Sequence, residues 1–159
     1  MAKLDLTARP DKQEIVLTRV FDAPRDKVFK AFTDPKLIAR WWGGPLYQMT
    51  IDTMDARPGG TWRFVQKGRD GREHGFHGVY HDVTSPERLI YTFEYEGLPE
   101  PGHVLLETVT FEALPGGKTK LTDLAVFPSV ADRDGMLAAG MEEGATASMD
   151  ELARLVERG

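Results

Sequence analysis

Six runs of alternating apolar and polar residues follow one another between residues 46 and 127, separated only by short turn segments. Successive residues of a β-strand point to opposite faces, so each run predicts a strand with one apolar face. Short connections join antiparallel neighbours, because a parallel crossover needs a dozen or more residues. The sequence therefore predicts an antiparallel sheet. Its runs cover residues 46–55, 60–67, 73–83, 88–96, 103–113 and 118–127.

One more strand and two short helices are predicted ahead of these runs. Residues 13–22 alternate and contain several β-branched side chains, which is typical of a strand. Helical spacing of apolar residues predicts a short helix over residues 24–32. Asp34 can cap a second short helix that begins at Pro35. Since 159 residues fit one core, we expect an N-terminal extension over 1–12 and a single domain over 13–159.

Helical spacing returns near the C-terminus and predicts one long helix over residues 136–157. Gly140 and Gly144 lie four residues apart within it, and each helical glycine costs about 1 kcal/mol relative to alanine. Two explanations are open. The glycines let the sheet approach closely, or their missing side chains leave space for a ligand beneath the helix.

The widths of these elements predict the architecture. Seven strands about 4.8 Å apart form a sheet about 30 Å wide, whereas one helix is about 10 Å across. A flat sheet would leave most of its apolar face in water, so the sheet must curl around the helix. The predicted class is α+β, with a curved antiparallel sheet of six to seven strands wrapped around the long C-terminal helix. The two short helices lie between the first and second strands and close one end, and a cavity is expected between sheet and helix.

Composition excludes several classes of function. Cysteine is absent, which excludes disulfides, zinc-thiolate sites, iron–sulfur clusters and a cysteine nucleophile. The formal net charge of -5 argues against a nucleic-acid partner. No stretch approaches the roughly 20 apolar residues of a membrane span, and the first twelve residues lack the apolar core of a signal peptide. We therefore expect a cytoplasmic protein with no stable membrane insertion.

Metal and cofactor sites are not expected. His74 points away from His77 and His81, which share a strand face but stand roughly 13 Å apart. Zinc–nitrogen bonds of about 2.1 Å do not span that gap, although a bulge in the strand would change it. The glycine pairs lack the later glycines and lysine that phosphate binding requires, and no serine lies in a Gly-x-Ser-x-Gly turn.

An ordered set of segments resembles one family. The segments are Phe21-Asp22-Ala23-Pro24, Val28-Phe29, Thr33-Asp34-Pro35, Trp41-Trp42-Gly43, Arg57-Pro58-Gly59-Gly60, Gly78, Pro86-Glu87-Arg88-Leu89 and Thr92. Together with a long C-terminal helix they look like the START-like (SRPBCC, helix-grip) superfamily. More narrowly, they are similar to bacterial single-domain proteins related to the C-terminal domain of the activator of heat-shock-protein-90 ATPase. The resemblance implies a helix-grip fold with a cavity. It also implies relatives that bind lipids, polyketides or other apolar molecules, a minority of which catalyse cyclisation or aromatisation.

Aromatic side chains gather on single faces of the predicted strands. If those faces are concave, they provide apolar walls for a ligand, and Met141 of the helix provides an adaptable one. Plain core packing is the alternative. The strand residues concerned are Trp62, Phe64, Phe76, Tyr80, Tyr91 and Phe93. Trp41 and Trp42 either gate one end of the cavity or plug the core between the short helices.

Two carboxylates interrupt otherwise apolar strand faces. Glu107 and Asp123 each share a face with aliphatic and aromatic neighbours. A buried carboxylate without a partner costs several kcal/mol or takes up a proton. We therefore predict that both side chains are polar anchors for a ligand, or an acid and a base. A different register, or an ion pair with Arg63 or His103, is the structural alternative.

The predicted function is binding of a small apolar, lipid-like or polyketide-like molecule in the cavity between sheet and helix. One alternative is a cyclase, aromatase or hydrolase-type enzyme that uses the cavity carboxylates with a tyrosine. Another is a chaperone-associated interaction protein, which would require an exposed apolar patch outside the cavity. A chaperone partner is doubtful, because the eukaryotic activator acts through an additional N-terminal domain. The catalytic residues, the identity of the ligand and formation of a homodimer are left open.

Overall fold

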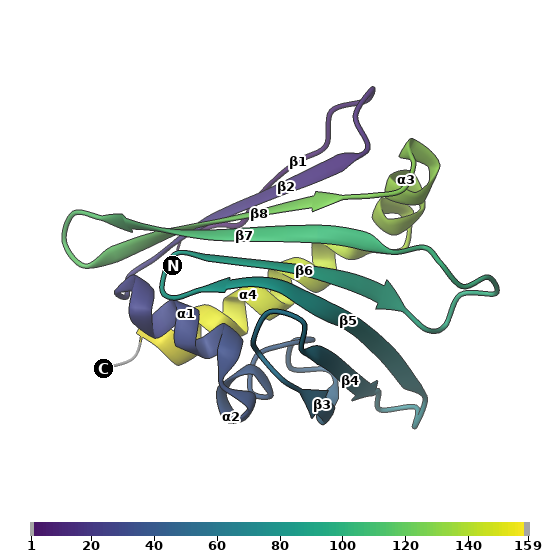
Figure 1. The fold of residues 1–159 in the computed structure, drawn as a ribbon, viewed down its shortest axis with the longest axis horizontal. Helices are drawn as coiled ribbons and strands as arrows, with labels where there is room; N and C mark the ends of the chain where they lie inside the picture. The colour runs from purple at the N-terminus through teal and green to yellow at the C-terminus, as the bar shows by residue number, and fades with distance from the viewer. Residues whose placement is uncertain (1, 158–159) are drawn as a thin grey trace.

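The structure is a computed structural model that describes residues 2–157, and in that range one antiparallel sheet packs against helices (Figure 1). The strands are β1 (Asp5–Thr7), β2 (Glu14–Phe21), β3 (Gln48–Met54), β4 (Thr61–Lys67), β5 (Glu73–Thr84), β6 (Arg88–Tyr95), β7 (Leu105–Leu114) and β8 (Lys118–Val126). The helices are α1 (Arg25–Thr33), α2 (Pro35–Ile38), α3 (Val130–Ala138) and α4 (Met141–Glu157).

The sheet has eight strands in the order β1-β2-β8-β7-β6-β5-β4-β3, and every neighbouring pair is antiparallel. The prediction of an antiparallel sheet is confirmed, but the predicted count of six to seven strands is wrong. The additional strand is β1, which lies inside the segment predicted as an extension and pairs with β2. It has only three residues, too few for an alternating pattern to reveal.

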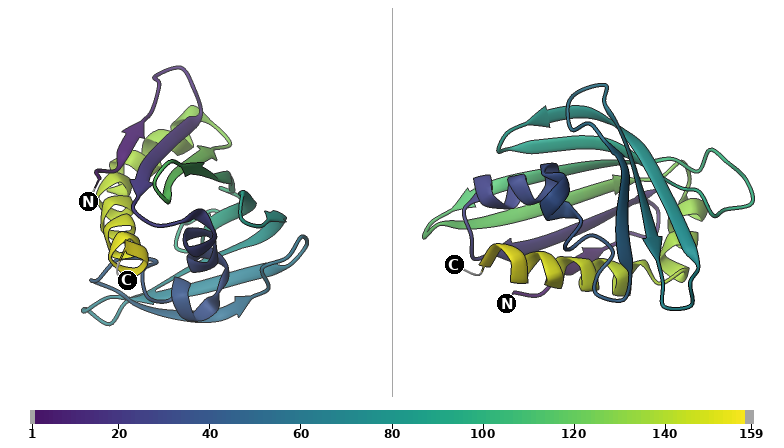
Figure 2. Two further views of the ribbon diagram at one scale, coloured as in Figure 1. Left: turned by 90° about the vertical axis from the view of Figure 1, so that its left-hand side faces the viewer. Right: turned by 90° about the horizontal axis from the view of Figure 1, so that it is seen from below.

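The sheet curves, and α4 lies along its concave face (Figure 2). Helices α1 and α2 lie at one end of this face, and α3 lies at the other end (Figure 1). Directly paired residues of neighbouring strands point to the same face. The pairs Tyr80↔Tyr91 and Tyr91↔Glu107 therefore align three side chains on the face that α4 covers.

The predicted single helix over 136–157 is wrong, because the chain forms two helices there. Gly140 lies between α3 and α4 with φ of +87°, a conformation that glycine adopts without steric cost. No heavy atom outside the local chain lies within 4 Å of a Cβ placed at Gly140 or Gly144. Close approach of the sheet therefore explains neither glycine, and at Gly140 the turn between the helices does.

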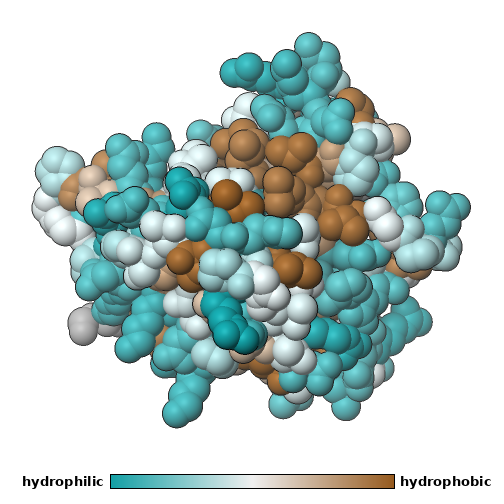
Figure 3. All heavy atoms as spheres, viewed as in Figure 1, coloured by the Kyte–Doolittle hydropathy of each residue, from teal (hydrophilic) through white to brown (hydrophobic). Residues whose placement is uncertain are grey.

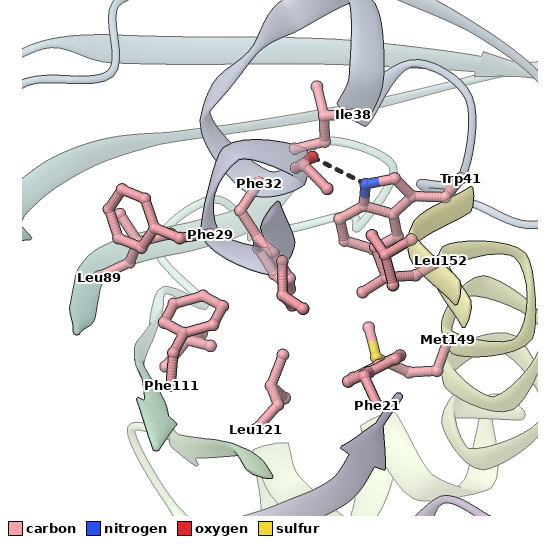
Figure 4. Packing of buried hydrophobic residues seen from close by; sticks show 14 of the residues in the cluster. Phe21, Phe29, Phe32, Ile38, Trp41, Leu89, Phe111, Leu121, Met149 and Leu152 are labelled. Atoms are coloured by element: carbon pink, nitrogen blue, oxygen red, sulfur yellow. Dashed lines mark hydrogen bonds between the residues drawn. The ribbon is translucent and has the colours of Figure 1, made fainter. Parts of the chain in front are cut away.

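The interior consists of two hydrophobic clusters. The larger joins α1, α2 and the C-terminal half of α4 to the sheet, and Figure 4 shows Phe111, Leu121 and Leu152 facing one another within it. In the same cluster Trp41 is 3% exposed, and its indole Nε1 donates to the carbonyl of Ala31 over 2.9 Å. The smaller cluster lies toward α3 and contains Ile15, Leu17, Leu105, Ala125 and Phe127.

The outer face of the sheet, which points away from α4, also carries apolar side chains. Leu106 and Val126 are directly paired on β7 and β8 and are 41% and 36% exposed. Figure 3 shows a hydrophobic area on this side of the molecule. An exposed apolar patch therefore exists outside the concave face.

None of the helices within residues 2–157 is long and apolar enough to cross a membrane.

Candidate functional site

A cavity of about 660 Å³ opens between the concave face of the sheet and α3. Its apolar wall includes Phe76, Phe93, Leu105, Phe127 and Met136. Ligand sites for small organic molecules usually have volumes of about 300 to 1,000 Å³ and mostly apolar walls. The cavity therefore has the size and the chemistry of a small-molecule site.

Small residues on α3 and at its C-cap leave this space unfilled. Ala131, Gly135 and Ala139 are spaced four apart, which places them along one side of the helix, and all three line the cavity. The opposite wall consists of larger aromatic side chains from β5 and β6. The small side chains of α3 do not reach the aromatic side chains on the concave face of the sheet. The space between them therefore stays open.

A second cavity, of about 30 Å³, lies deeper among aromatic side chains. It is too small for an organic ligand. Phe93 lines both cavities, and Trp42 stacks against Phe93 and Phe76 with ring centroids 6.4 and 5.1 Å apart. Phe93 therefore lies between the two spaces, and Trp42 lines only the small one. Trp42 is half-buried, whereas Trp41 is fully packed in the core.

Three polar side chains meet on the concave face. Tyr91 is paired with Glu107, and Glu107 is paired with Ala125, the next inward-facing residue after Asp123. The Tyr91 hydroxyl lies beside the Glu107 carboxyl, and the carboxyl groups of Glu107 and Asp123 lie beside each other. Both carboxyls are enclosed by protein, and both side chains retain some accessible surface.

Burial controls the protonation of these carboxyls. Desolvation and the neighbouring charge of Asp123 raise the pKa of Glu107 well above its usual range. Desolvation also raises the pKa of Asp123, to about 6, although the hydrogen bond from Glu107 acts in the opposite direction. Burial and the two carboxylates keep the pKa of Tyr91 well above its usual value, so this hydroxyl stays a donor. Near neutral pH the two carboxyls therefore share one proton and one negative charge.

The ion pairs with Arg63 or His103, which were the structural alternative for these carboxyls, do not form. Arg63 binds Glu96 and Asp52, with N–O distances of 2.8 and 3.2 Å. His103 Nδ1 lies 2.8 Å from Asp132, whose hydrogen bond raises the pKa of the imidazole.

The structure places the predicted site residues in three groups. Phe76 and Phe93 line the large cavity, and the aromatic side chains at 62, 64, 80, 91 and 93 line the small one. Glu107 and Asp123 line neither of these two cavities. Met141 begins α4 and packs against the smaller hydrophobic cluster instead. The break before α4 places Met141 at the start of that helix, and the ligand-binding role of the nine residues stays a prediction.

Several cavity residues were not predicted. Gln66 is 8% exposed and faces His74 across the β4–β5 pair, and both line the large cavity. His74 Nδ1 lies 3.1 Å from the Tyr95 hydroxyl. Gln66 and His74 lie two residues from Phe64 and Phe76 on the same strands and point to the same face. The alternating pattern could therefore have predicted that both face the cavity. The α3 residues were missed because that helix was predicted to begin later.

Within residues 2–157, no group of three histidine or acidic side chains is arranged to hold a metal ion. His74 and His77 point to opposite faces of β5, as the alternation predicts. His74 faces the cavity, and His77 lies outside between Glu94 and Glu96, 3.2 and 2.8 Å away.

The fold and the cavity define a START-like, helix-grip protein. A sheet of eight antiparallel strands curves around a C-terminal helix and leaves a cavity beside it. The family described as "Activator of Hsp90 ATPase homolog 1-like protein" matches residues 22–157, so the chain belongs to this family. A comparison with curated proteins finds no match.

Solved structures of bacterial proteins share the fold. Protein CV1439 from Chromobacterium violaceum is 28% identical with a TM-score of 0.82, over 92% of this chain and 99% of that one. Protein Ms6760 from Mycobacterium smegmatis is 23% identical with a TM-score of 0.88, over 100% and 99% of the two chains. The AHSA1 protein from Silicibacter pomeroyi is 21% identical with a TM-score of 0.74, over 89% and 95%. The resemblance of the sequence to this family is therefore confirmed.

Proposed function

We propose that the protein binds a small, largely apolar organic molecule in the large cavity. The observation that supports this function is the cavity of about 660 Å³ between aromatic strand residues and the small-residue side of α3. A side-chain core of ordinary packing density leaves few voids larger than a water molecule. A cavity of this size with a mainly apolar wall favours a ligand over a structural purpose.

Filling the cavity from α3 should abolish binding. Ala131 is exposed and lines the cavity, so Ala131→Trp places a large side chain in the ligand's space without replacing a core residue. We expect the affinity for the neutral fluorophore N-phenyl-1-naphthylamine to fall at least tenfold, as measured by fluorescence titration. Ala138→Trp is the matched control, because Ala138 is exposed on the same helix but does not line the cavity, and it should change the affinity less than twofold. Equal affinities for both variants would argue against this site.

Acid–base catalysis on the bound molecule is the second candidate function. The observation that favours it is the grouping of Tyr91, Glu107 and Asp123 on the concave face, where burial raises the pKa of all three side chains. Such a set can give and accept a proton near neutral pH.

A mass-spectrometric comparison of ligands before and after incubation tests this second function. The unmutated chain should convert a bound ligand, and Tyr91→Phe should stop the conversion while changing ligand affinity less than threefold. Recovery of every bound ligand unchanged would leave binding as the only function of the site.

A further inference from the structure

A polar seam crosses the concave face between the two hydrophobic clusters. It consists of Arg19 on β2, Asp123 on β8, Glu107 on β7 and Tyr91 on β6. On each of β2, β7 and β8, the inward-facing residues toward α3 belong to the smaller cluster and those toward α1 belong to the larger one. Polar groups between two apolar clusters need a partner, because an unpaired buried group costs about 1–3 kcal/mol.

The seam lies directly beyond the inner end of the large cavity. Phe93 and Leu105 line the cavity and are paired across β6 and β7. The next inward-facing residues on these strands are Tyr91 and Glu107, about 6.6 Å further along at the usual strand rise. Phe93 packs against both hydrophobic clusters, so this side chain stands between the cavity and the seam.

One buried acceptor of the seam has no hydrogen-bond donor among the described residues. Tyr91 lies beside Glu107, and Glu107 lies beside Asp123. Within the described residues, Asp123 Oδ1 has almost no accessible surface and no hydrogen-bond partner. Arg19 donates to Asp150 of α4 over 2.8 Å, so a carboxylate of the helix already offsets its charge. The seam therefore ends in an acceptor that carries negative charge.

The lining of the cavity points to the same ligand chemistry. No lysine or arginine is among the described residues that line it, and its His103 is bound to Asp132. Its other histidine, His74, has Nδ1 3.1 Å from the Tyr95 hydroxyl, so the lining offers a carboxylate or phosphate two imidazoles and no lysine or arginine. Aromatic faces such as those of Phe93 and Tyr91 attract cations instead.

We propose that the ligand carries a protonated amine or amidine that reaches Asp123 past Phe93, and an apolar body that lies against the cavity wall. The cationic group supplies the donor that Asp123 Oδ1 lacks and neutralises the charge shared by the two carboxyls. This inference rests on the proposed ligand-binding function and specifies the class of ligand: an amphipathic organic amine.

Three probes that share one ring system and differ in charge test the inference. Calorimetric titration at pH 7 compares 2-naphthylmethylamine, 2-naphthalenemethanol and 2-naphthoate on the full chain. The amine should bind at least tenfold more tightly than the alcohol, and the carboxylate should bind most weakly. Asp123→Asn should weaken amine binding at least tenfold and change alcohol binding less than threefold. Asp26→Asn, which removes an exposed carboxylate of α1, is the control for net charge and should keep the preference for the amine.

The outcomes separate the inference from the function on which it rests. If amine and alcohol bind the unmutated chain equally, the inference is wrong and the cavity remains a ligand site. If none of the three probes binds and N-phenyl-1-naphthylamine also fails to bind, the proposed function itself is wrong. The order of the three probes on the unmutated chain decides the inference even if Asp123→Asn does not fold, which a melting curve would reveal.

Discussion

Replacing Gly78 by alanine should destabilise the protein by about 3 kcal/mol, at the upper end of the usual cost of overpacking. A Cβ at Gly78 would lie 1.8 Å from the carbonyl oxygen of Thr92 and 2.6 Å from Nε1 of Trp62. The first neighbour is backbone of β6 and cannot swing away, so β5 and β6 would have to separate. These strands contribute Phe76 and Phe93 to the cavity, and we therefore expect ligand affinity to fall as well. Urea denaturation measures the loss of stability.

Gly144→Ala is the matched control for this substitution. Gly144 lies inside α4, and no heavy atom outside the local helix lies within 4 Å of the added Cβ. Alanine is favoured over glycine in a helix interior by about 1 kcal/mol, so this variant should be more stable than the unmutated chain. Equal stability of the Gly78→Ala and unmutated proteins would show that the strands adjust freely at Gly78.

The strands and the curved sheet could be predicted because each depends on local patterns. Alternation over 13–22 and 46–127 specified which residues face inward, and short turns specified antiparallel neighbours. Strand β1 was not predicted, because three residues are too few to show an alternating pattern. Its pairing with β2 depends on contacts between residues distant in the sequence. The break between α3 and α4 at Gly140 was not predicted, because the apolar spacing around Gly140 also fits one continuous helix. Only the positive φ of Gly140 in the structure shows that the chain turns there.

The candidate site was predictable in its residue types but not in its assembly. The alternation identified Glu107 and Asp123 as inward-facing acids, and the structure brings them together with Tyr91. The register of the strands determines whether Glu107, Asp123 and Tyr91 lie close together. That register cannot be derived without the order of the strands across the sheet. The cavity wall formed by Ala131, Gly135 and Ala139 was missed, because small residues signal a space only when the opposite surface is known.

Glu107→Gln should stabilise the protein at neutral pH. Burial raises the pKa of Glu107 above its value in the unfolded chain, so the folded protein keeps a proton that the unfolded chain releases as pH rises above about 4.3. Each pH unit above that value then costs the folded state about 1.4 kcal/mol, until the raised pKa is reached. Glutamine does not titrate, yet its amide can donate to Asp123 and its oxygen can accept from Tyr91. The variant should be more stable than the unmutated chain at pH 7 and equally stable at pH 4.

Urea denaturation of both proteins at pH 4, 6 and 8 measures this gain. The difference in free energy of unfolding should grow with pH between 4 and 6, because only the unmutated chain loses stability through Glu107 in that range. Glu112→Gln is the matched control, since Glu112 is an exposed residue of the same strand, β7, and its replacement should leave the pH profile unchanged. A Glu107→Gln variant less stable than the unmutated chain at pH 8 would mean that the carboxyl is ionised and stabilised in the fold. The shared proton, and with it the single negative charge offered to a cationic ligand, would then be excluded.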